Sequence, residues 1–268
     1  KGDTSEEQKQ NQGTDLDDAG DEEPPRDPLV IDLNGDEIDL NPVEQGVYFD
    51  LDNDGISEMT GWIGKEDGFL AIDKNGDKKI TSGNELFGDS YIKSDNSIAV
   101  SGADAIADLN DYVADQTSDN EFGVIDKNDS RFKDLLVWQD LNSDGICDDG
   151  ELKTLEEAGI ESISLDFSNT ETVEVEHGIF KTESSLVTKA DGKKVEISEH
   201  WFTANSYDTT DYRDLANGMV VSSVDSFGKV MSLNNAIFTD ETGVLGEMVE
   251  KFKASDDYIE KRILIKRD

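Results

Sequence analysis

The residues in this sequence that are best suited to chemistry are carboxylates repeated at every second position. Residues 140–151 read Asp-Leu-Asn-Ser-Asp-Gly-Ile-Cys-Asp-Asp-Gly-Glu. A twelve-residue calcium loop needs oxygen ligands at alternating positions, glycine at position six and a closing carboxylate at position twelve. The stretch departs from this pattern only at position eight, where Cys147 replaces an aliphatic residue. It predicts a calcium site with the ligands Asp140, Asn142, Asp144, the carbonyl of Ile146, Asp148 and Glu151.

A second stretch carries most of the same pattern. Its expected ligands are Asp73, Asn75, Asp77, the carbonyl of Lys79 and Glu85. Lys78 stands where glycine is preferred, and Glu85 falls at position thirteen, one residue late. We predict a calcium site here as well. For the first stretch, residues 140–151, the alternative to a calcium site is an acidic turn between two helices.

Three weaker stretches complete the set. The third offers Asp50, Asp52 and Asp54, and the fourth offers Asp32, Asn34 and Asp36. Neither has an acid at position twelve, so another carboxylate must close the third loop, and Asp67 is one candidate. For both stretches the alternative is a polar hairpin turn. The fifth is irregular in its first half and consists of Asp119, Glu121, Gly123, Asp126 and Asp129.

A different kind of chemistry is available at the Asp27-Pro28 bond. The Asp27 carboxylate can attack its own main-chain carbonyl and close a five-membered anhydride, while the imino nitrogen of proline leaves once it is protonated. Such an intramolecular attack has an effective molarity of about 10⁵ M or more when the geometry is held. The dipeptide alone is weak evidence in so acidic a chain. Its position at the joint between an acidic segment and the first apolar run predicts an accessible bond beside a folded edge.

The composition limits the partners. The chain has 268 residues, with 63 acidic and 24 basic side chains and a formal charge of -39. This balance excludes nucleic acid and an anionic membrane surface as partners, because both are bound through lysine and arginine. No apolar run approaches the roughly 18–20 residues of a membrane span, so no membrane insertion is expected. Charge repulsion of this size indicates that bound cations help to hold the fold.

Three regions follow from the pattern along the chain. Residues 1–26 contain nine acidic side chains and almost nothing apolar, which predicts a disordered linker. Residues 27–202 form the expected calcium-binding module. Residues 203–268 are expected to form a mostly helical extension, with helices at 244–254 and 257–265. Because the chain begins at Lys1 rather than methionine, we expect it to be part of a longer protein.

The elements that must position the loops are expected to form an α+β fold. Short apolar runs at 29–31, 47–49, 62–63 and 69–72 predict a small β meander, and Asp191-Gly192 predicts a hairpin turn. Apolar spacing predicts helices over 103–113, 130–139 and 153–158, with Gly159 as a helix stop. Two of these helices would flank the loop at 140–151, giving EF-hand-like helix-loop-helix units beside the β hairpins.

Several unusual peptides occur here in a familiar order. They are Asp-Pro-Leu-Val-Ile-Asp-Leu-Asn-Gly-Asp at 27–36, Tyr-Phe-Asp-Leu-Asp at 48–52, Thr-Gly-Trp-Ile-Gly at 60–64, Glu-Leu-Phe-Gly at 85–88 and Val-Trp-Gln-Asp at 137–140. Over residues 27–202 the chain resembles the self-processing module of FrpC-type RTX proteins, which Gram-negative bacteria secrete. The resemblance implies that calcium folds the module and that the module then cleaves Asp27-Pro28. It also implies that the new terminal aspartate can link to a lysine of a neighbouring protein.

Two functions are consistent with these features of the sequence. The first is a calcium-triggered autoproteolytic module that acts once on its own chain, as part of a secreted protein. The second is a calcium-rigidified structural or adhesion spacer in which Asp27-Pro28 has no role. Both predict calcium-dependent folding, and only the first predicts scission.

Overall fold

The structure is a computed structural model that describes residues 25–109, 123–168, 172–177 and 179–210, together with 248, 249 and 251. Strands are the main regular elements of the described residues; the α-helix among those within 25–210 is the short α1 (Gly102–Ala107), and residues 248, 249 and 251 are also helical. The strands are β1 (Leu29–Ile31), β2 (Leu40–Asn41), β3 (Val47–Phe49), β4 (Ser57–Thr60), β5 (Trp62–Ile63), β6 (Gly68–Ile72), β7 (Val124–Asp126), β8 (Leu135–Trp138), β9 (Leu152–Thr154), β10 (Ile160–Ser164), β11 (Val173–Glu176), β12 (Ile179–Lys189), β13 (Lys194–Trp201) and β14 (Ala204–Thr210). Three 3₁₀ turns accompany them, namely η1 (Val43–Gln45), η2 (Gly83–Glu85) and η4 (Phe132–Asp134).

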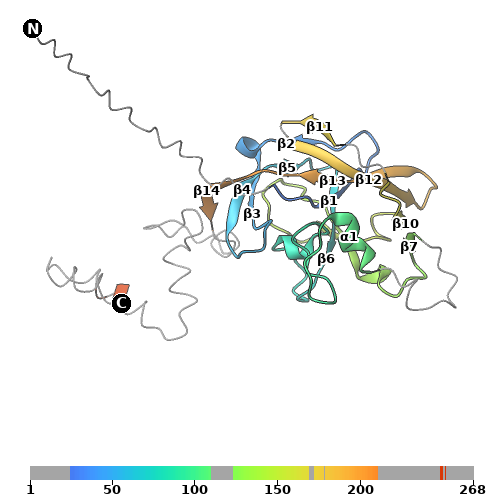
Figure 1. Cartoon of the computed structure of the whole chain (residues 1–268), viewed down its shortest axis with the longest axis horizontal. Helices are drawn as coiled ribbons and strands as arrows, with labels where there is room; N and C mark the ends of the chain where they lie inside the picture. The colour runs from blue at the N-terminus through green and yellow to red at the C-terminus, as the bar shows by residue number, and fades with distance from the viewer. Residues whose placement is uncertain are drawn as a thin grey trace, which may run out of the picture.

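The strands form one large curled sheet and two small ones. The large sheet has nine strands in the order β7-β10-β12-β13-β1-β6-β8-β9, with β11 paired to β12. A three-stranded sheet has the order β14-β4-β3, and β2 pairs with β5. All of these pairings are antiparallel. Figure 1 shows the three-stranded sheet at one end of the fold, β7 and β10 at the other, and α1 against the central strands.

The central strands are buried on both faces of the large sheet. Every residue of β6 is buried, and alternate side chains enter different cores because successive side chains of a strand point to opposite faces. Leu70 packs in the core that includes the helix residue Ile106. Phe69 packs in the second core, with Trp62 and Trp138. These two cores explain why the strands read as short continuous apolar runs.

The four apolar runs predicted as strands are strands in the structure, at β1, β3, β5 and β6. The predicted hairpin turn is also present: Gly192 has a φ angle of 80° and lies between β12 and β13. The helix predicted over 103–113 begins at Gly102, where the Asp104 N–H donates to the capping Ser101 Oγ at 3.2 Å, and it ends at Ala107. Residues 110–113 lie outside the described residues.

The α+β prediction with EF-hand helices is wrong. Residues 130–139 contain η4 and then β8, which pairs with β6 and β9. Residues 153–158 contain the end of β9 and a turn, in which Gly159 has a φ angle of 69°. The apolar run at 135–138 fits helical spacing and a doubly buried strand equally well, and periodicity cannot separate the two. These residues form a strand because they lie between β6 and β9 in the sheet and pair with both.

The boundaries of the three predicted regions are only partly described. Residues 1–24 lie outside the described residues, while Arg26 already bridges to Phe202 in the fold. The extension predicted as mostly helical instead begins with strand β14. The predicted helices at 244–254 and 257–265 lie outside the described residues, except for residues 248, 249 and 251. No helix in the described ranges is long and apolar enough to cross a membrane.

Candidate functional site

Four of the predicted carboxylate loops begin at the ends of strands. Asp32 follows β1, Asp50 follows β3, Asp73 follows β6, and Asp140 comes two residues after the end of β8. Since β1, β6 and β8 are neighbours in the large sheet, the sheet supports three of the four loops directly. The loops are therefore held by strands and not by the pair of helices that defines an EF-hand.

The four loops share one backbone conformation, with positive φ angles at positions four and six. The residues are Gly35 (83°) and Glu37 (85°), Asn53 (62°) and Gly55 (93°), Gly76 (79°) and Lys78 (64°), and Ser143 (56°) and Gly145 (74°). Positive φ favours glycine, and each loop has glycine at one of the two positions. Glu37 and Lys78, which replace glycine at position six, thus adopt the same conformation as Gly55 and Gly145.

The first aspartate of each loop organises the turn. Each accepts two backbone N–H groups from within its own loop, at 2.6 to 3.3 Å. The donors are Gly35 and Glu37 for Asp32, Asp54 and Gly55 for Asp50, Gly76 and Lys78 for Asp73, and Asp144 and Gly145 for Asp140. These hydrogen bonds therefore fix the loop backbone around the first aspartate, the residue that a cation loop places at position one.

A buried glutamate closes two of the loops in the same way. Glu151 accepts the N–H groups of Leu141 at 2.9 Å and Asp148 at 3.0 Å, which are positions two and nine of its loop. Glu85 accepts the N–H groups of Lys74 at 3.3 Å and Thr81 at 2.9 Å, again positions two and nine. The one-residue delay of Glu85 in the sequence thus makes no difference to its place in the loop.

These two loops also lie against each other. The Lys79 ammonium donates to the Cys147 carbonyl at 3.2 Å, and the position-eight side chains Ile80 and Cys147 are buried in the same core. Burial raises the pKa of the Cys147 thiol to about 11, so this cysteine packs as a small apolar side chain. The Trp62 indole N–H donates to Asp140 Oδ2 at 2.8 Å, which links the loop to the aromatic core.

The loop at 50–55 gathers three carboxylates. Ligand oxygens of Asp50, Asp52 and Asp54 all lie within 4.8 Å of one another, and this is the one such group among the residues that the structure describes. Burial of Asp50 and the negative charge of Asp52 raise the pKa of Asp50 to about 7. A hard divalent cation fits this set, because the ligands are oxygens and a cation would relieve the repulsion between the three carboxylates.

Asp67 lies near a different loop from the third loop, for which it was a candidate ligand. It accepts the Asp39 N–H at 2.8 Å through Oδ2, whereas its buried Oδ1 has no hydrogen-bond partner. Burial and the charges of Asp32, Asp39 and Asp36 raise the pKa of Asp67 to about 7. Asp67 thus lies close enough to the loop at 32–37 for the charges of Asp32 and Asp36 to act on it.

The fifth stretch does not share the loop conformation. Asp126 Oδ1 accepts the Asn128 N–H at 2.7 Å, and Asp129 Oδ2 accepts the Asp126 N–H at 2.8 Å. These bonds make a tight turn at the end of β7. Gly123 precedes this strand, so it is separated from the acids that follow it. Asp119 and Glu121 lie outside the described residues.

The Asp27-Pro28 bond lies inside the fold, which corrects the expectation that it is accessible. Asp27 is completely buried and Pro28 is buried as well. Pairing with both neighbours holds the segment: Arg26 and Phe202 exchange backbone hydrogen bonds of 3.0 and 2.8 Å, and the Leu29 N–H donates to the Phe87 carbonyl at 2.8 Å. Insertion of β1 between β6 and β13 carries the bond into the interior.

The segment at 87–89 packs directly on this bond. A Cβ atom added to Gly88 would lie 3.1 Å from Pro28 N and 3.2 Å from the Asp27 carbonyl carbon. The Asp89 N–H donates to Asp27 Oδ1 at 2.7 Å, while Asp27 Oδ2 is buried without a hydrogen-bond partner. The close approach of the main chain thus leaves little room for a side chain at residue 88, and only one of the two carboxyl oxygens of Asp27 accepts a main-chain N–H.

The surroundings of Asp27 favour its neutral form. Burial, followed by the negative charges of Asp89 and Glu199, raises the pKa of Asp27 to about 9. Glu199 is itself buried, and burial raises its pKa too. At neutral pH the Asp27 carboxyl group therefore keeps its proton, next to the nitrogen of Pro28.

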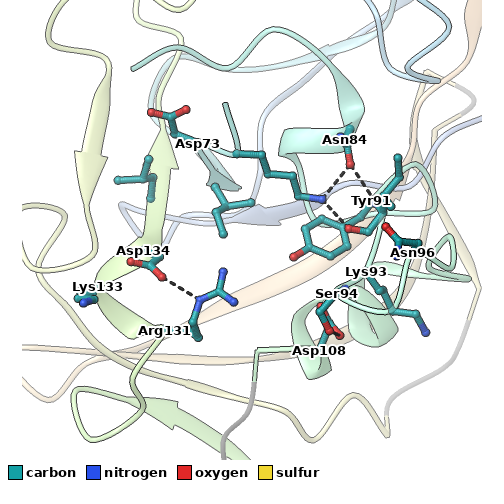
Figure 2. Close-up of a pocket in the computed structure, with 14 residues that line it drawn as sticks. Asp73, Asn84, Tyr91, Lys93, Ser94, Asn96, Asp108, Arg131, Lys133 and Asp134 are labelled. Atoms are coloured by element: carbon teal, nitrogen blue, oxygen red, sulfur yellow. Dashed lines mark hydrogen bonds and ion pairs between the residues drawn. The ribbon is translucent and has the colours of Figure 1, made fainter. Parts of the chain in front are cut away.

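A separate pocket of about 650 Å³ lies beside the loop at 73–85. Figure 2 shows the Tyr91 ring in this pocket, with Ser94 and Asp108 on one side and the bonded pair Arg131 and Asp134 on the other. The Lys74 ammonium lies 3.4 Å from the centroid of the Tyr91 ring. Tyr91 stacks on Phe87 with a centroid separation of 5.0 Å. The pocket wall is thus continuous with the segment that supports the Asp27-Pro28 bond.

Sequence reasoning did not identify Arg26, Gly88 or Asp89 as parts of this site. Gly88 stands in one of the familiar peptides, Glu-Leu-Phe-Gly, so the signal was present but had no assigned role. Asp89 and Arg26 contribute through contacts across 62 and 63 residues of sequence. No local pattern encodes such contacts.

Comparison with known proteins identifies the region. A family model described as the SPM domain matches residues 29–203. The chain is also similar to the iron-regulated protein FrpA of Neisseria meningitidis serogroup C, with 33% identity over 236 residues. The aligned part is 86% of this chain and 20% of FrpA, so the chain spans about a fifth of the length of this curated relative.

Proposed function

The chain belongs to the SPM domain family, and from this premise we propose that it is a calcium-triggered module that cleaves its own Asp27-Pro28 bond. The observation that carries this proposal is the state of the Asp27 carboxyl group. One oxygen is anchored by the Asp89 N–H at 2.7 Å, and the other is buried without a partner. Burial and nearby acids raise the pKa of this group to about 9.

A neutral Asp27 carboxyl group contains both components that the reaction needs. Its unanchored oxygen, Oδ2, attacks the main-chain carbonyl carbon of Asp27, and the bond from this carbon to Pro28 N breaks. The carboxyl proton passes to Pro28 N, which leaves as a secondary amine. The products are a five-membered anhydride at residue 27 and a new amino terminus at Pro28, and no co-reactant is consumed.

Packing restricts the motion of this carboxyl group. The Asp89 N–H limits rotation of the side chain, and Gly88 allows the main chain of 87–89 to cover the peptide group closely. Both effects favour an intramolecular attack, whose rate depends on holding the two groups near their reacting positions. Burial also keeps water away from the peptide carbonyl while the carboxyl group attacks it.

The loops that begin at Asp32, Asp50, Asp73 and Asp140 are the calcium sites in this proposal. Calcium supplies positive charge that neutralises their carboxylates when it is bound. The closing carboxylates are Glu85, Glu151 and, for the first loop, Asp67. The loop residues themselves hold strands β1, β3, β6 and β8 at the ends from which they extend, and β1 contains the residues that follow Pro28.

Two fates are open to the anhydride. Water converts it to a free aspartate at residue 27, and a lysine side chain of a neighbouring protein converts it to an amide that links the two molecules. The resemblance to RTX proteins supports a secreted, extracellular setting in bacteria, where calcium is abundant. The reaction occurs once per chain, so the module is not a multiple-turnover enzyme.

The test is to incubate the purified chain at neutral pH, in millimolar calcium and in excess chelator, and to follow it by mass spectrometry. Calcium should give the fragments 1–27 and 28–268, and chelator should leave the chain whole. Added hydroxylamine should become attached to fragment 1–27, because it traps an anhydride. Asp27→Asn should slow cleavage at least about 1,000-fold, because the amide is a poor nucleophile and has no acidic proton.

Asp21→Asn is the matched control, since it makes the same change six residues earlier in the chain. It should cleave like the parent. If the parent chain remains whole in calcium for days, the self-cleaving function is excluded. The calcium-rigidified spacer is then the function that the loops support.

A further inference from the structure

The side chain of Arg26 lies between two carboxylates that belong to different parts of the molecule. Its Nη1 is 3.2 Å from Asp89 Oδ2, and its Nη2 is 3.9 Å from Asp52 Oδ2. The Arg26 side chain is 25% exposed and that of Asp52 is 8% exposed, so solvent screens the second pair only in part. The main chain of Arg26 exchanges two hydrogen bonds with that of Phe202, which fixes the point from which the guanidinium group extends.

Each of the two partners has a role already described. Asp52 is the central member of the group of three carboxylates in the loop at 50–55. The main-chain N–H of Asp89 anchors the Asp27 carboxyl group, and its side chain places a negative charge near that group. Arg26 itself precedes Asp27 in the chain. It therefore connects the carboxylates at 50–54 with the residues around the Asp27-Pro28 bond.

We propose that Arg26 is a positioning residue that couples cation binding at Asp50, Asp52 and Asp54 to the Asp27-Pro28 bond. This inference rests on the proposed function and concerns the regulation of the same site. In the absence of a cation, Arg26 shares its single positive charge between Asp52 and Asp89. A cation in the loop draws the Asp52 oxygens toward itself, and Arg26 then pairs with Asp89 alone.

The distances support this order of events. The contact with Asp52 is the longer of the two, so it is the one that gives way. A guanidinium group can bind a carboxylate through two parallel hydrogen bonds, and Arg26 can complete such a pair with Asp89 once Asp52 is occupied. The paired Asp89 side chain fixes the main chain of residue 89, and the N–H of that residue holds Asp27 Oδ1. The loop and the reacting carboxyl group are thereby linked through three residues.

The experiment compares Arg26→Gln with Arg26→Lys. Both variants lose the planar fork of arginine, and only the second keeps the positive charge. The calcium concentration at half-maximal folding is measured by tryptophan fluorescence, in chains that also carry Asp27→Asn and cannot cleave. The maximal cleavage rate is measured at saturating calcium in chains with Asp27 intact. Arg131→Gln and Arg131→Lys are the control pair, because Arg131 is paired with Asp134 through an ion pair of 2.8 Å and touches neither carboxylate partner of Arg26.

Competition between Arg26 and calcium predicts opposite changes in the two measurements. The calcium midpoint of Arg26→Gln should be about two- to fivefold lower than that of Arg26→Lys, which is the range that a partly screened charge pair supports. Its maximal rate should be lower than that of Arg26→Lys, and about tenfold below the parent, because Asp89 is no longer held. A residue with a merely structural role would shift both measurements in the unfavourable direction together.

Equal midpoints for the two Arg26 variants, or a parental rate in Arg26→Gln, would overturn the inference. So would an equal effect in the Arg131 pair. If no chain cleaves, including the parent, the proposed function fails. The midpoints still decide whether Arg26 competes with calcium, since they are measured without cleavage.

Discussion

Asp27 and Asp140 are both almost completely buried, but very different numbers of hydrogen-bond donors surround their carboxyl groups. Asp140 accepts the N–H groups of Asp144 and Gly145 and that of the Trp62 indole. Asp27 accepts a single N–H, from Asp89. Burial raises the pKa of both groups, and donors to the ionised form oppose this rise. The three donors favour the charged form of Asp140 and oppose the rise in its pKa. Asp27 has a single N–H donor, which offsets little of the rise in pKa that burial causes.

The comparison separates two uses of an acidic side chain within one fold. The first aspartate of each loop accepts several N–H groups that favour its ionised form, which suits it to bind a cation. Asp27 is organised to stay neutral, which suits it to give up a proton during bond cleavage. Calcium binding and cleavage of the chain therefore depend on different environments of the aspartate carboxyl group. The four predictions below test this difference, from the largest effect to the smallest.

Removing calcium should have the largest effect, because the loop carboxylates repel one another without it. We expect excess chelator to abolish the cooperative thermal transition of residues 28–200, and calcium to restore it. Circular dichroism and the fluorescence of Trp62 and Trp138, which are completely buried in the core, report this change. Magnesium at the same concentration is the control and should restore less structure, since it prefers a smaller and more rigid site. Identical melting curves with and without chelator would contradict the prediction.

Gly88→Ala should separate the two regions, because it changes the surroundings of Asp27 and leaves the loops intact. The added Cβ would meet Pro28 N and the Asp27 carbonyl carbon at 3.1 to 3.2 Å, so the main chain must shift. We expect maximal cleavage to slow about 100-fold, as a misplacement of roughly 1 Å does in other intramolecular reactions. The calcium midpoint of folding should stay within about twofold. A parental cleavage rate in this variant would show that the close packing is not needed.

Glu151→Gln should weaken calcium binding without acting on Asp27 directly. A neutral amide replaces a carboxylate that accepts two N–H groups, from Leu141 and Asp148. We expect the calcium midpoint to rise about tenfold, which corresponds to about 1.4 kcal/mol. Glu85→Gln should have a similar effect, since Glu85 closes its loop in the same way. Isothermal titration calorimetry measures both variants.

Glu157→Gln is the matched control for these two glutamates. Glu157 also accepts a backbone N–H, from Thr154, but it is exposed and lies outside the loops. Its calcium midpoint should equal that of the parent. If Glu151→Gln binds calcium as the parent does, the closing role of the buried glutamates is wrong.

The pH dependence of stability should identify the proton on Asp27. The pKa of Asp27 is about 9 in the folded chain and 3.8 ordinarily, so the folded state binds the extra proton between these values. The stabilising contribution of neutral Asp27 is complete below pH 4 and is lost as pH rises through 9. The slope is up to about 1.4 kcal/mol per pH unit.

This dependence is measured in calcium, by comparing chains that carry Pro28→Ala with and without Asp27→Asn. The alanine slows cleavage in both, and the asparagine cannot titrate. The melting temperature of the chain with Asp27 should fall relative to its partner between pH 6 and pH 9. Parallel curves over this range would mean that Asp27 is already ionised in the folded protein.

The loops could be recognised from sequence because the chemistry of a cation site is local. Alternating oxygen ligands and a glycine at a turn are encoded within twelve residues, and the structure gives the four loops a common backbone. The elements around them could not be recognised in the same way. The run at 135–138 fits a helix and a strand equally well, and only its pairing with β6 and β9 makes it a strand. EF-hand helices were therefore predicted where strands occur.

The sequence by itself determined the carboxylate loops, the apolar strands and the Asp27-Pro28 dipeptide, because each depends on neighbouring residues. Tertiary structure decided the state of that dipeptide. Asp27 becomes buried only because β1 is inserted between β6 and β13, and its carboxyl group is anchored by Asp89, 62 residues away. Tertiary structure also brought Asp67 near Asp32, Asp36 and Asp39, which lie 28 or more residues earlier in the chain. Burial and charge act through space, and no spacing of residues along the chain encodes them.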